Sequence, residues 1–384
     1  MQSKTSNSVW FREPPLDERF AAATGRVRVL EDSMLNAEDL RRLSDPSVGF
    51  AQRAELLEKA GYSGEGTLES RVIEGRDRQD LLLRELTIGT VLGTFLLLDQ
   101  DYHNAKAIVR YIRLRQSEMD EVSTRVHSAD DSSQGGSTTE TLPAKLHNLI
   151  RETAPTPPEK LFELLLHMIN EGATTEAPPG MRPLFYEHLR RIVAQIGTNS
   201  DLVTTDLLAD KLWFAEMIAI AGARETGKMR PFLTDYISIL ADSANFETFF
   251  RLRRSRGSKS FLASALVPGG TTLPETFVEH FYAESQALVP LWQRSLLADV
   301  AADLPEYSDS EDIWSYGLNA DLVLLKLAAK GKESTAGAEA ITGFWLGKRL
   351  EAKNIRIVLQ AIARGLDGDE IRKLLRPAYK GYRL

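Results

Sequence analysis

A short pattern that occurs three times in this sequence constrains its fold more than any other feature. In each copy an acidic residue is followed by Asn three positions later, and apolar residues come one, four and five positions after the Asn. The pairs are Asp101/Asn104, Asp242/Asn245 and Glu351/Asn354. This spacing places the apolar residues on one face of an α-helix with the polar pair beside them, so each copy predicts a helix with one buried face.

The three copies are far apart, and basic residues follow each of them. They begin at residues 101, 242 and 351, separations that are much longer than the repeat of a solenoid protein. Each copy also ends a long apolar segment. We therefore predict three domain-sized helical units, each closing on a similar helix, over residues 16–118, 142–258 and 259–384.

Two segments lack the apolar residues that a packed core requires. Residues 128–140 are rich in Ser, Thr, Gly and Asp, and their one apolar residue is Ala129. This composition is typical of a flexible loop, so residues 119–141 are predicted to be a linker between the first two units. The polar residues 1–15, which end in a Pro pair, are predicted to be a disordered leader.

The remaining sequence predicts helices and no strands. Its apolar residues recur at the period of an α-helix, whereas no segment alternates with a period of two for long enough to predict a strand. Asn36 with Asp39 predicts a capped helix start, and Leu366–Glu370 predicts a turn followed by another helix start. The predicted fold class is all-α.

Composition restricts the class of protein further. The 384 residues exceed a typical domain of ~100–200 residues, which agrees with two or three domains. The absence of Cys excludes disulfides and thiolate metal sites and favours a cytosolic or cytosol-facing compartment. The polar N-terminus shows no signal peptide, and the longest uncharged run, Leu86–Leu98, is shorter than the roughly 20 residues that cross a bilayer.

Charge is distributed unevenly along the chain. The formal net charge is -7, yet the segment from Lys348 to Leu384 contains ten basic and four acidic residues. A basic end on an acidic protein favours a docking surface for an acidic partner or a membrane headgroup layer. We predict Arg372, Lys373 and Arg376 as candidates for that surface. The alternative for each of them is an ordinary solvated helix face.

The motifs that resemble catalytic or cofactor sites do not fit their context. Gly222–Met229 matches G-x-x-x-x-G-K, but Met229 replaces the Ser or Thr that holds magnesium, and the preceding residues predict a helix where a phosphate loop follows a strand. The six His residues show no metal-binding spacing. We therefore predict no catalytic residue, no metal and no cofactor. A pI of about 5.6 and the lack of a nucleic-acid motif predict no nucleic-acid partner.

The polar pairs require a different explanation. Burying a carboxylate is costly unless it has a partner, so the pairs either lie on solvated helix faces or make an equivalent inter-helix contact in each unit. We predict the second alternative, in which the pairs are structural or interface residues. The residues predicted for this role are Asp101, Asn104, Asp242, Asn245, Glu351, Asn354 and Arg356.

Three segments together resemble a known family, the C subunit of the V-type and archaeal-type rotary ATPases, which corresponds to the d subunit of the vacuolar enzyme. RLEAKNIRIVLQAIARGLDGDEIRKLL resembles its C-terminal signature, DYHNAKAIVRYIR its first Asp-x-x-Asn segment, and FAAATGRVRVLEDSMLNAEDLRRL its N-terminal helices. The chain departs from the family pattern at Phe20, near which the family often has Tyr, and at Arg253, where the other copies have Ile. Residues 128–140 resemble an insertion.

The resemblance implies a fold and a function. It implies an all-helical funnel of three similar domains around a pseudo-threefold axis. The protein would be a non-catalytic part of the central rotor of a proton or sodium V-type ATPase, coupling ion transport to ATP synthesis or hydrolysis. Its partners would be rotor-ring and central-stalk subunits, on the cytoplasmic side of the membrane, with membrane contact only through the rotor ring.

Two other function classes stay open on the residues alone. The first is a cytosolic helical scaffold or nucleic-acid-associated protein that uses the basic C-terminal region, and the second is a hydrolase with an unrecognised site. Salt-dependent binding to DNA would favour the first, and turnover by the isolated chain would favour the second. Co-purification with a membrane rotor ring and stalk subunits would favour the rotary ATPase.

Overall fold

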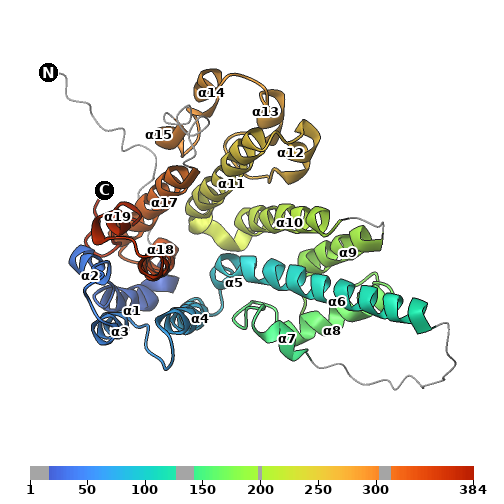
Figure 1. The fold of residues 1–384 in the computed structure, drawn as a ribbon, viewed down its shortest axis with the longest axis horizontal. Coiled ribbons are helices and arrows are strands. Elements are labelled where there is room, and N and C mark those ends of the chain that lie inside the picture. The colour runs from blue at the N-terminus through green and yellow to red at the C-terminus, as the bar shows by residue number, and fades with distance from the viewer. Residues whose placement is uncertain (1–16, 127–141, 198–200, 302–312) are drawn as a thin grey trace. The chain divides into compact units, whose positions relative to one another are not determined.

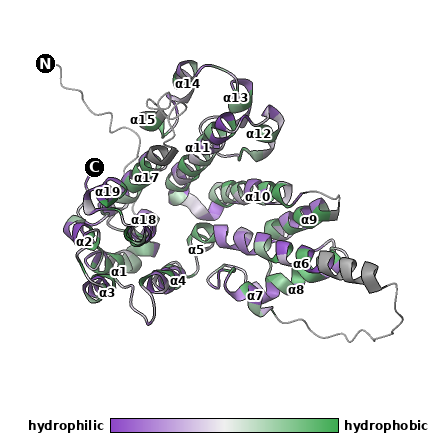
Figure 2. Cartoon of the chain, in the orientation of Figure 1, coloured by the Kyte–Doolittle hydropathy of each residue, from purple (hydrophilic) through white to green (hydrophobic). Residues whose placement is uncertain are grey.

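A computed structural model describes residues 17–126, 142–197, 201–301 and 313–384 (Figure 1). Within these ranges the secondary structure consists of α-helices and short 3-10 helices, and no strand occurs. This confirms the predicted all-α class. Many of the ribbons in Figure 2 carry both green and purple stretches, as expected of helices that bury one face and expose the other.

The described helices group into two compact units by their contacts. The smaller unit is Leu96–Met217, and the larger unit joins the residues up to Phe95 with those from Ile218 onward. The larger unit therefore combines two segments that are distant in sequence. The arrangement of three similar domains as a pseudo-threefold funnel stays a prediction.

The first segment of the larger unit consists of helices, three of which begin at a residue whose side chain accepts a backbone N–H of the first turn. Its elements are η1 (Glu18–Phe20), α1 (Ala21–Glu31), α2 (Ala37–Leu43), α3 (Phe50–Lys59), α4 (Leu68–Leu86) and α5 (Leu92–Leu96). The predicted capped start of α2 is confirmed, since Asn36 accepts the Asp39 N–H at 2.9 Å and the Asp39 carboxylate accepts the Asn36 N–H at 3.1 Å. This capping box satisfies two backbone donors that the first turn leaves free.

The second segment of the larger unit contains the other two copies of the polar-pair pattern. Its elements are η2 (Arg224–Met229), α11 (Arg230–Arg254), α12 (Lys259–Ala265), α13 (Pro274–Glu279), α14 (Ser285–Trp292), α15 (Ala298–Ala301), α17 (Ile313–Lys330), η3 (Gly331–Glu333), α18 (Ala338–Ala363) and α19 (Gly368–Lys373). The start of α19 is capped by Asp367, which confirms the turn and helix start predicted at Leu366–Glu370.

Helix α18 is the centre of the larger unit, because it packs against α17, α4, α1, α2 and α19. The apolar face predicted for the third copy is buried there, with Ile355 and Val358 fully inaccessible and Leu359 8% exposed. These residues join one core with leucines of α2 and α3. The burial explains why a helix close to the C-terminal end of the sequence organises the N-terminal helices.

Two glycines allow α18 to approach its neighbours very closely. A Cβ on Gly343 would lie 2.4 Å from the Ala328 carbonyl oxygen of α17, and a Cβ on Gly331 would lie 2.2 Å from the Glu339 carbonyl oxygen. Both distances are shorter than a non-bonded carbon and oxygen tolerate. The close contact between α17, η3 and α18 therefore requires glycine at both positions.

Helix α11 buries the apolar face of the second copy in an aromatic cluster. The ring of Trp292 lies 4.7 Å from that of Phe246 and 5.7 Å from that of Phe249, centroid to centroid, and both pairs are edge-to-face. Phe277 stacks on the same Trp292 at 5.9 Å. Such aromatic pairs stabilise packing beyond the area that they bury, so they hold α13 and α14 against α11.

The smaller unit is built on α6, which carries the first copy (Figure 1). Its elements are α6 (Leu98–Val126), α7 (Ala144–His147), α8 (Pro158–Asn170), α9 (Pro183–Gly197) and α10 (Leu202–Gly222), whose last residues belong to the larger unit. Helix α6 packs on α8, and α8 packs on α9. Ile108 and Val109 of the first copy are buried in this packing.

The predicted domain boundaries can be compared with the ends of the observed helices. The leader, residues 1–15, and the Ser-rich and Gly-rich residues 128–140 lie outside the described residues. Helix α6 continues to Val126, beyond the predicted end of the first unit at residue 118. The predicted boundary after residue 258 falls between α11 and α12.

The uncharged run Leu86–Leu98 does not form one helix. It is divided among the end of α4, the short α5 and the start of α6. In the ranges that the structure describes, no helix has the length and apolar character needed to cross a membrane.

Candidate functional site

Each of the three predicted Asn residues holds one backbone residue through two hydrogen bonds, an arrangement that we call an Asn clamp. In the first clamp, Asn104 Nδ2 donates to the Arg151 carbonyl at 2.9 Å, and the Arg151 N–H donates to Asn104 Oδ1 at 2.7 Å. Asn245 holds Val267 in the same way, at 2.9 and 2.8 Å. A short side-chain amide presents one donor and one acceptor side by side, which matches the N–H and C=O of one residue.

The third clamp joins Asn354 to Arg376, with both hydrogen bonds at 2.9 Å. In all three copies a short helix (α7, α12 or α19) lies between the long helix and the clamped residue. The clamped residue lies 22 positions after the Asn in the second and third copies and 47 after it in the first. The extra length in the first copy includes residues 128–140, the segment that resembles an insertion.

The acidic residues of the first two pairs bind the chain just beyond the clamped residue. Asp101 accepts the Thr156 N–H at 2.9 Å. Asp242 accepts the Thr272 N–H at 3.1 Å and the Thr271 N–H at 3.2 Å, and the Ser295 hydroxyl donates to it at 2.6 Å. In both copies the bound Thr is the fifth residue after the clamped one, so the two loops are held by the same pair of side chains in the same order.

The acidic residue of the third pair binds a different part of the chain. The longer side chain of Glu351 accepts the Leu35 N–H at 2.6 Å, in the loop before α2, and pairs with Lys348 at 2.6 Å. The Lys348 ammonium also donates to the Ala60 carbonyl at 2.7 Å. The third pair therefore fastens α18 both to its own returning chain, through Asn354, and to the N-terminal helices.

Burial excludes the alternative of solvated helix faces for the three pairs. The exposed fraction is 5% for Glu351 and 1% or less for the other five side chains. Burial raises the pKa of Asp101 to about 6 and also raises the pKa of Asp242 and Glu351. The hydrogen bonds to each carboxylate oppose the shift, as do the charges of Arg182 near Asp101 and of Lys348 near Glu351. The role of the pairs as an equivalent contact in three domains stays a prediction, while the paired hydrogen bonds of the three Asn side chains are alike in geometry.

Next to Asp101 lies a buried polar network that sequence patterns did not indicate. The Tyr102 hydroxyl donates to Glu216 at 2.7 Å and lies 2.5 Å from His188 Nδ1. Arg182 bridges the network, with its Nε 2.8 Å from Glu216 and its Nη2 2.8 Å from Asp101.

Burial affects the titration of this network. It lowers the pKa of His188 and raises the pKa of the Tyr102 hydroxyl, which keeps both side chains neutral near pH 7. Glu216 interrupts an apolar helical run, Leu212–Ala221, and this lone charge was the one signal available in the sequence. Neutral Tyr and His with a salt-bridged Glu and Arg form a structural network inside the smaller unit.

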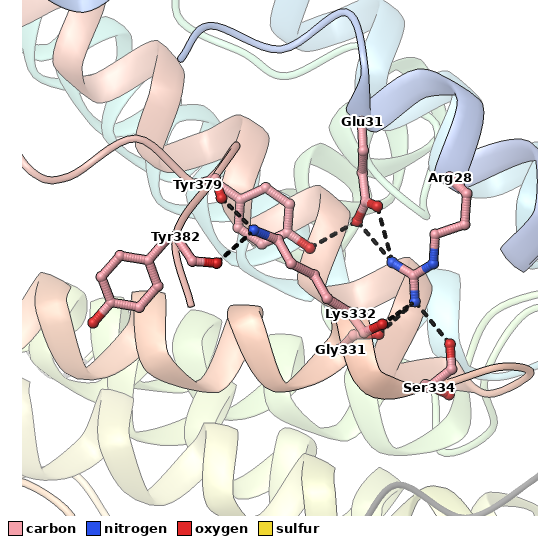
Figure 3. Close-up of polar contacts among 7 residues, drawn as sticks. All are labelled: Arg28, Glu31, Gly331, Lys332, Ser334, Tyr379 and Tyr382. Carbon is pink, nitrogen blue, oxygen red and sulfur yellow. Dashed lines mark hydrogen bonds and ion pairs between the residues drawn. The ribbon is translucent and has the colours of Figure 1, made fainter. Parts of the chain in front are cut away.

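In the larger unit, Arg28 of α1 binds the end of η3 (Figure 3). Its Nη2 donates to the carbonyls of Gly331, Lys332 and Ser334 at 2.8, 3.1 and 2.7 Å, and its Nη1 pairs with Glu31 at 2.9 Å. A guanidinium group has enough donors in a fixed plane to satisfy several carbonyls at once. Arg28 thereby ties the N-terminal helix to the turn that precedes α18.

The same cluster holds the C-terminal segment (Figure 3). The Tyr379 hydroxyl donates to Glu31 at 2.8 Å, and the Lys332 ammonium donates to the carbonyls of Tyr379 and Tyr382. The Tyr379 ring lies over Gly347 of α18, where a Cβ would be 2.5 Å from the ring. The last residues of the chain are therefore packed against α1 and α18.

The three residues predicted as a docking surface are not equivalent. Arg372 and Lys373 are exposed on α19, and Arg372 pairs with Asp369. Arg376 is 4% exposed, and its Nε donates to Asp321 at 2.6 Å. The prediction that Arg376 belongs to a docking surface is therefore wrong, because its side chain is buried in an ion pair and its backbone is held by the third clamp.

Arg356, the remaining predicted residue, is exposed on α18 beside the third pair. Within the described ranges no group of three or more His, Asp or Glu side chains is placed to hold a metal ion. The phosphate-loop lookalike at Gly222–Met229 follows helix α10 and forms the 3-10 helix η2, so it lacks the strand that precedes a phosphate loop.

The chain matches the model of a known protein family. The family model described as the ATP synthase (C/AC39) subunit matches residues 23–374. All three polar pairs lie inside this range, together with the helices that pack on α18 except the first two residues of α1. No curated protein matches the chain.

Proposed function

Because this chain belongs to the ATP synthase (C/AC39) subunit family, we propose that it is a non-catalytic central-rotor subunit of a V-type (V/A-type) rotary ATPase. In this role it couples the membrane rotor ring to the central stalk during proton or sodium transport and ATP synthesis or hydrolysis. It sits peripherally on the cytoplasmic side of the membrane. The observation that carries the proposal is the family match over residues 23–374.

The hydrogen-bonding of the long helices supports a role in passing torque. A protein that transmits torque has to keep its helices from sliding when force is applied along them. In α6, α11 and α18, a buried Asn fastens the helix to the chain that returns past it, and the adjacent carboxylate adds further hydrogen bonds. Buried hydrogen bonds of this kind resist displacement because breaking them leaves unsatisfied polar groups.

Docking to an acidic partner is proposed for the exposed basic end of α19. Arg372 and Lys373 lie in its last turn, where positive charge also interacts favourably with the helix dipole. Arg376 supports this surface from inside, since its ion pair with Asp321 and its clamp by Asn354 fix the chain after α19.

The test is purification of the tagged full chain from membranes in which the complex assembles. The double variant Arg372→Glu, Lys373→Glu is expected to retain less of the rotor ring and stalk subunits, or to lower ion pumping per ATP hydrolysed. Arg42→Glu, an exposed reversal on α2, serves as the control. Normal assembly and coupling by the double variant would contradict the docking surface. Failure of the wild-type chain to retain any rotor or stalk subunit would contradict the proposed function itself.

A further inference from the structure

A groove of about 390 Å³ lies between α4 and α18 in the larger unit. It is lined by Arg76, Arg349, Ala352, Lys353, Arg356, Ile357 and Gln360, and we call it the basic groove. Arg76 comes from α4 and the rest come from α18. Four of these side chains are cations and none is a carboxylate, although the whole chain has a net charge of -7.

The polar side chains of α18 in the groove form a straight stripe. They occupy positions 349, 353, 356 and 360, a spacing of four, three and four residues that keeps them on one helix face. At 1.5 Å per residue this stripe is roughly 16 Å long. Ile357 lies beside it and adds apolar surface to the groove, whereas Ala352 is buried beneath it.

The cations of the groove are held in different ways. Arg349 lies over the ring of Trp345, with its guanidinium carbon 4.3 Å from the ring centroid. The Lys353 ammonium is 2.5 Å from Asp321. Arg356 is exposed, and within the described ranges its side chain has no hydrogen bond or ion pair. Two cations are thus oriented by their neighbours, and a third is free to bind a ligand.

We propose that the basic groove binds a carboxylate-bearing helical segment of a protein partner. Carboxylates spaced four and three residues apart on the partner helix would face the cations of α18, since both helices repeat every 3.6 residues. An apolar residue of the partner would pack on the half-buried Ile357. The inference rests on the groove and does not depend on the rotor role.

The geometry favours a protein segment over a small anion. Phosphate groups bind where several donors converge on one point, often with free backbone N–H groups at a helix N-terminus. The groove lies along the middle of α18, where the backbone N–H groups are bonded within the helix. The three cations of α18 are spread along a line, so a single small ligand reaches few of them, whereas a helix lying along the groove can face all three.

The test measures binding of designed peptides to the full chain by fluorescence anisotropy. One labelled helix-forming peptide carries Glu at i, i+4 and i+7, and a second peptide has Gln at the same positions. We expect the Glu peptide to bind, with an affinity that falls as salt rises, and the Gln peptide to bind much more weakly. Arg356→Glu, which exchanges an attraction for a repulsion, is expected to weaken binding of the Glu peptide roughly tenfold, and Arg356→Gln is expected to weaken it less.

The matched control is Arg42→Glu, because Arg42 is also exposed and lies on α2, outside the groove. This control is expected to bind the Glu peptide like the wild type. Equal weakening by both reversals, or no binding of the Glu peptide, would overturn the proposal. Inorganic tripolyphosphate serves as a competitor. If it displaces the Glu peptide and has the higher affinity, the groove is a small-anion site and the proposal is overturned. The rotor role would not be affected by any of these outcomes.

Discussion

Removal of one Asn clamp should cost much more stability than a typical surface substitution. Asn245→Ala deletes both hydrogen bonds to Val267, which is 5% exposed. Among the residues that the structure describes, the Val267 N–H and C=O have no other hydrogen-bond partner. A buried polar group left without a partner costs about 1–3 kcal/mol, so two of them predict a loss of roughly 2–6 kcal/mol. The higher helix propensity of Ala offsets only about 0.5 kcal/mol of this loss.

Two further variants make the prediction specific. Asn104→Ala removes the equivalent bonds to Arg151, which is only half-buried, so that water can replace part of the lost contact. It should therefore cost less than Asn245→Ala. Asn170→Ala, at the exposed last residue of α8, should change the free energy of unfolding by less than about 0.5 kcal/mol.

Urea denaturation followed by circular dichroism measures all three variants against the wild-type chain. The loss of stability is expected to be largest for Asn245→Ala, smaller for Asn104→Ala and smallest for Asn170→Ala. A loss below about 1 kcal/mol for Asn245→Ala would refute it, because the two backbone groups would then be satisfied in another way. An Asn104→Ala variant less stable than Asn245→Ala would refute the argument from burial.

The close contact at Gly343 and the raised pKa of Asp101 can each be tested by a substitution. Gly343→Ala places a Cβ 2.4 Å from the Ala328 carbonyl oxygen and should destabilise the chain by about 1–3 kcal/mol in thermal denaturation. The control is Gly317→Ala on α17, where a Cβ meets no atom within 4 Å, and it should be neutral or stabilising. Equal effects of the two variants would contradict the close contact between α17 and α18. The pKa of Asp101 is raised to about 6 from 3.8, so the folded state binds this proton more tightly than the unfolded state. The penalty for its charge is present above pH 6 and disappears as the pH falls toward 4, and the wild type should therefore gain about 1 kcal/mol relative to Asp101→Asn between pH 7 and pH 5. A constant difference in urea midpoint between the two proteins across that range would show that Asp101 keeps an ordinary pKa.

Local signals in the sequence predicted the helices and the side of each helix that is buried. The capping box at Asn36 and Asp39 involves residues three positions apart, and the buried Ile355 and Val358 follow from the helical period. The six residues of the polar pairs could also be identified from the sequence, because each pair has the same spacing beside an apolar helix face.

The partners of those pairs could not be predicted. The residue that an Asn clamps, such as Val267 or Arg376, is chosen by its position in a returning loop and by its backbone, and a backbone N–H and C=O carry no signature in the sequence. Arg376 was predicted to be exposed because its side chain is charged, and the sequence does not show which residue pairs with it. Its burial depends on Asp321, which is 55 positions away in the sequence.

The sequence by itself therefore determined the all-helical class and the three places where a polar pair meets a buried face, because helix formation and amphipathicity depend on residues within a few turns. The tertiary structure alone decided which backbone groups the pairs hold, that Arg376 is buried and that four cations share one groove between α4 and α18. Those outcomes depend on how distant helices pack, since a polar side chain is buried only where folding brings it a partner.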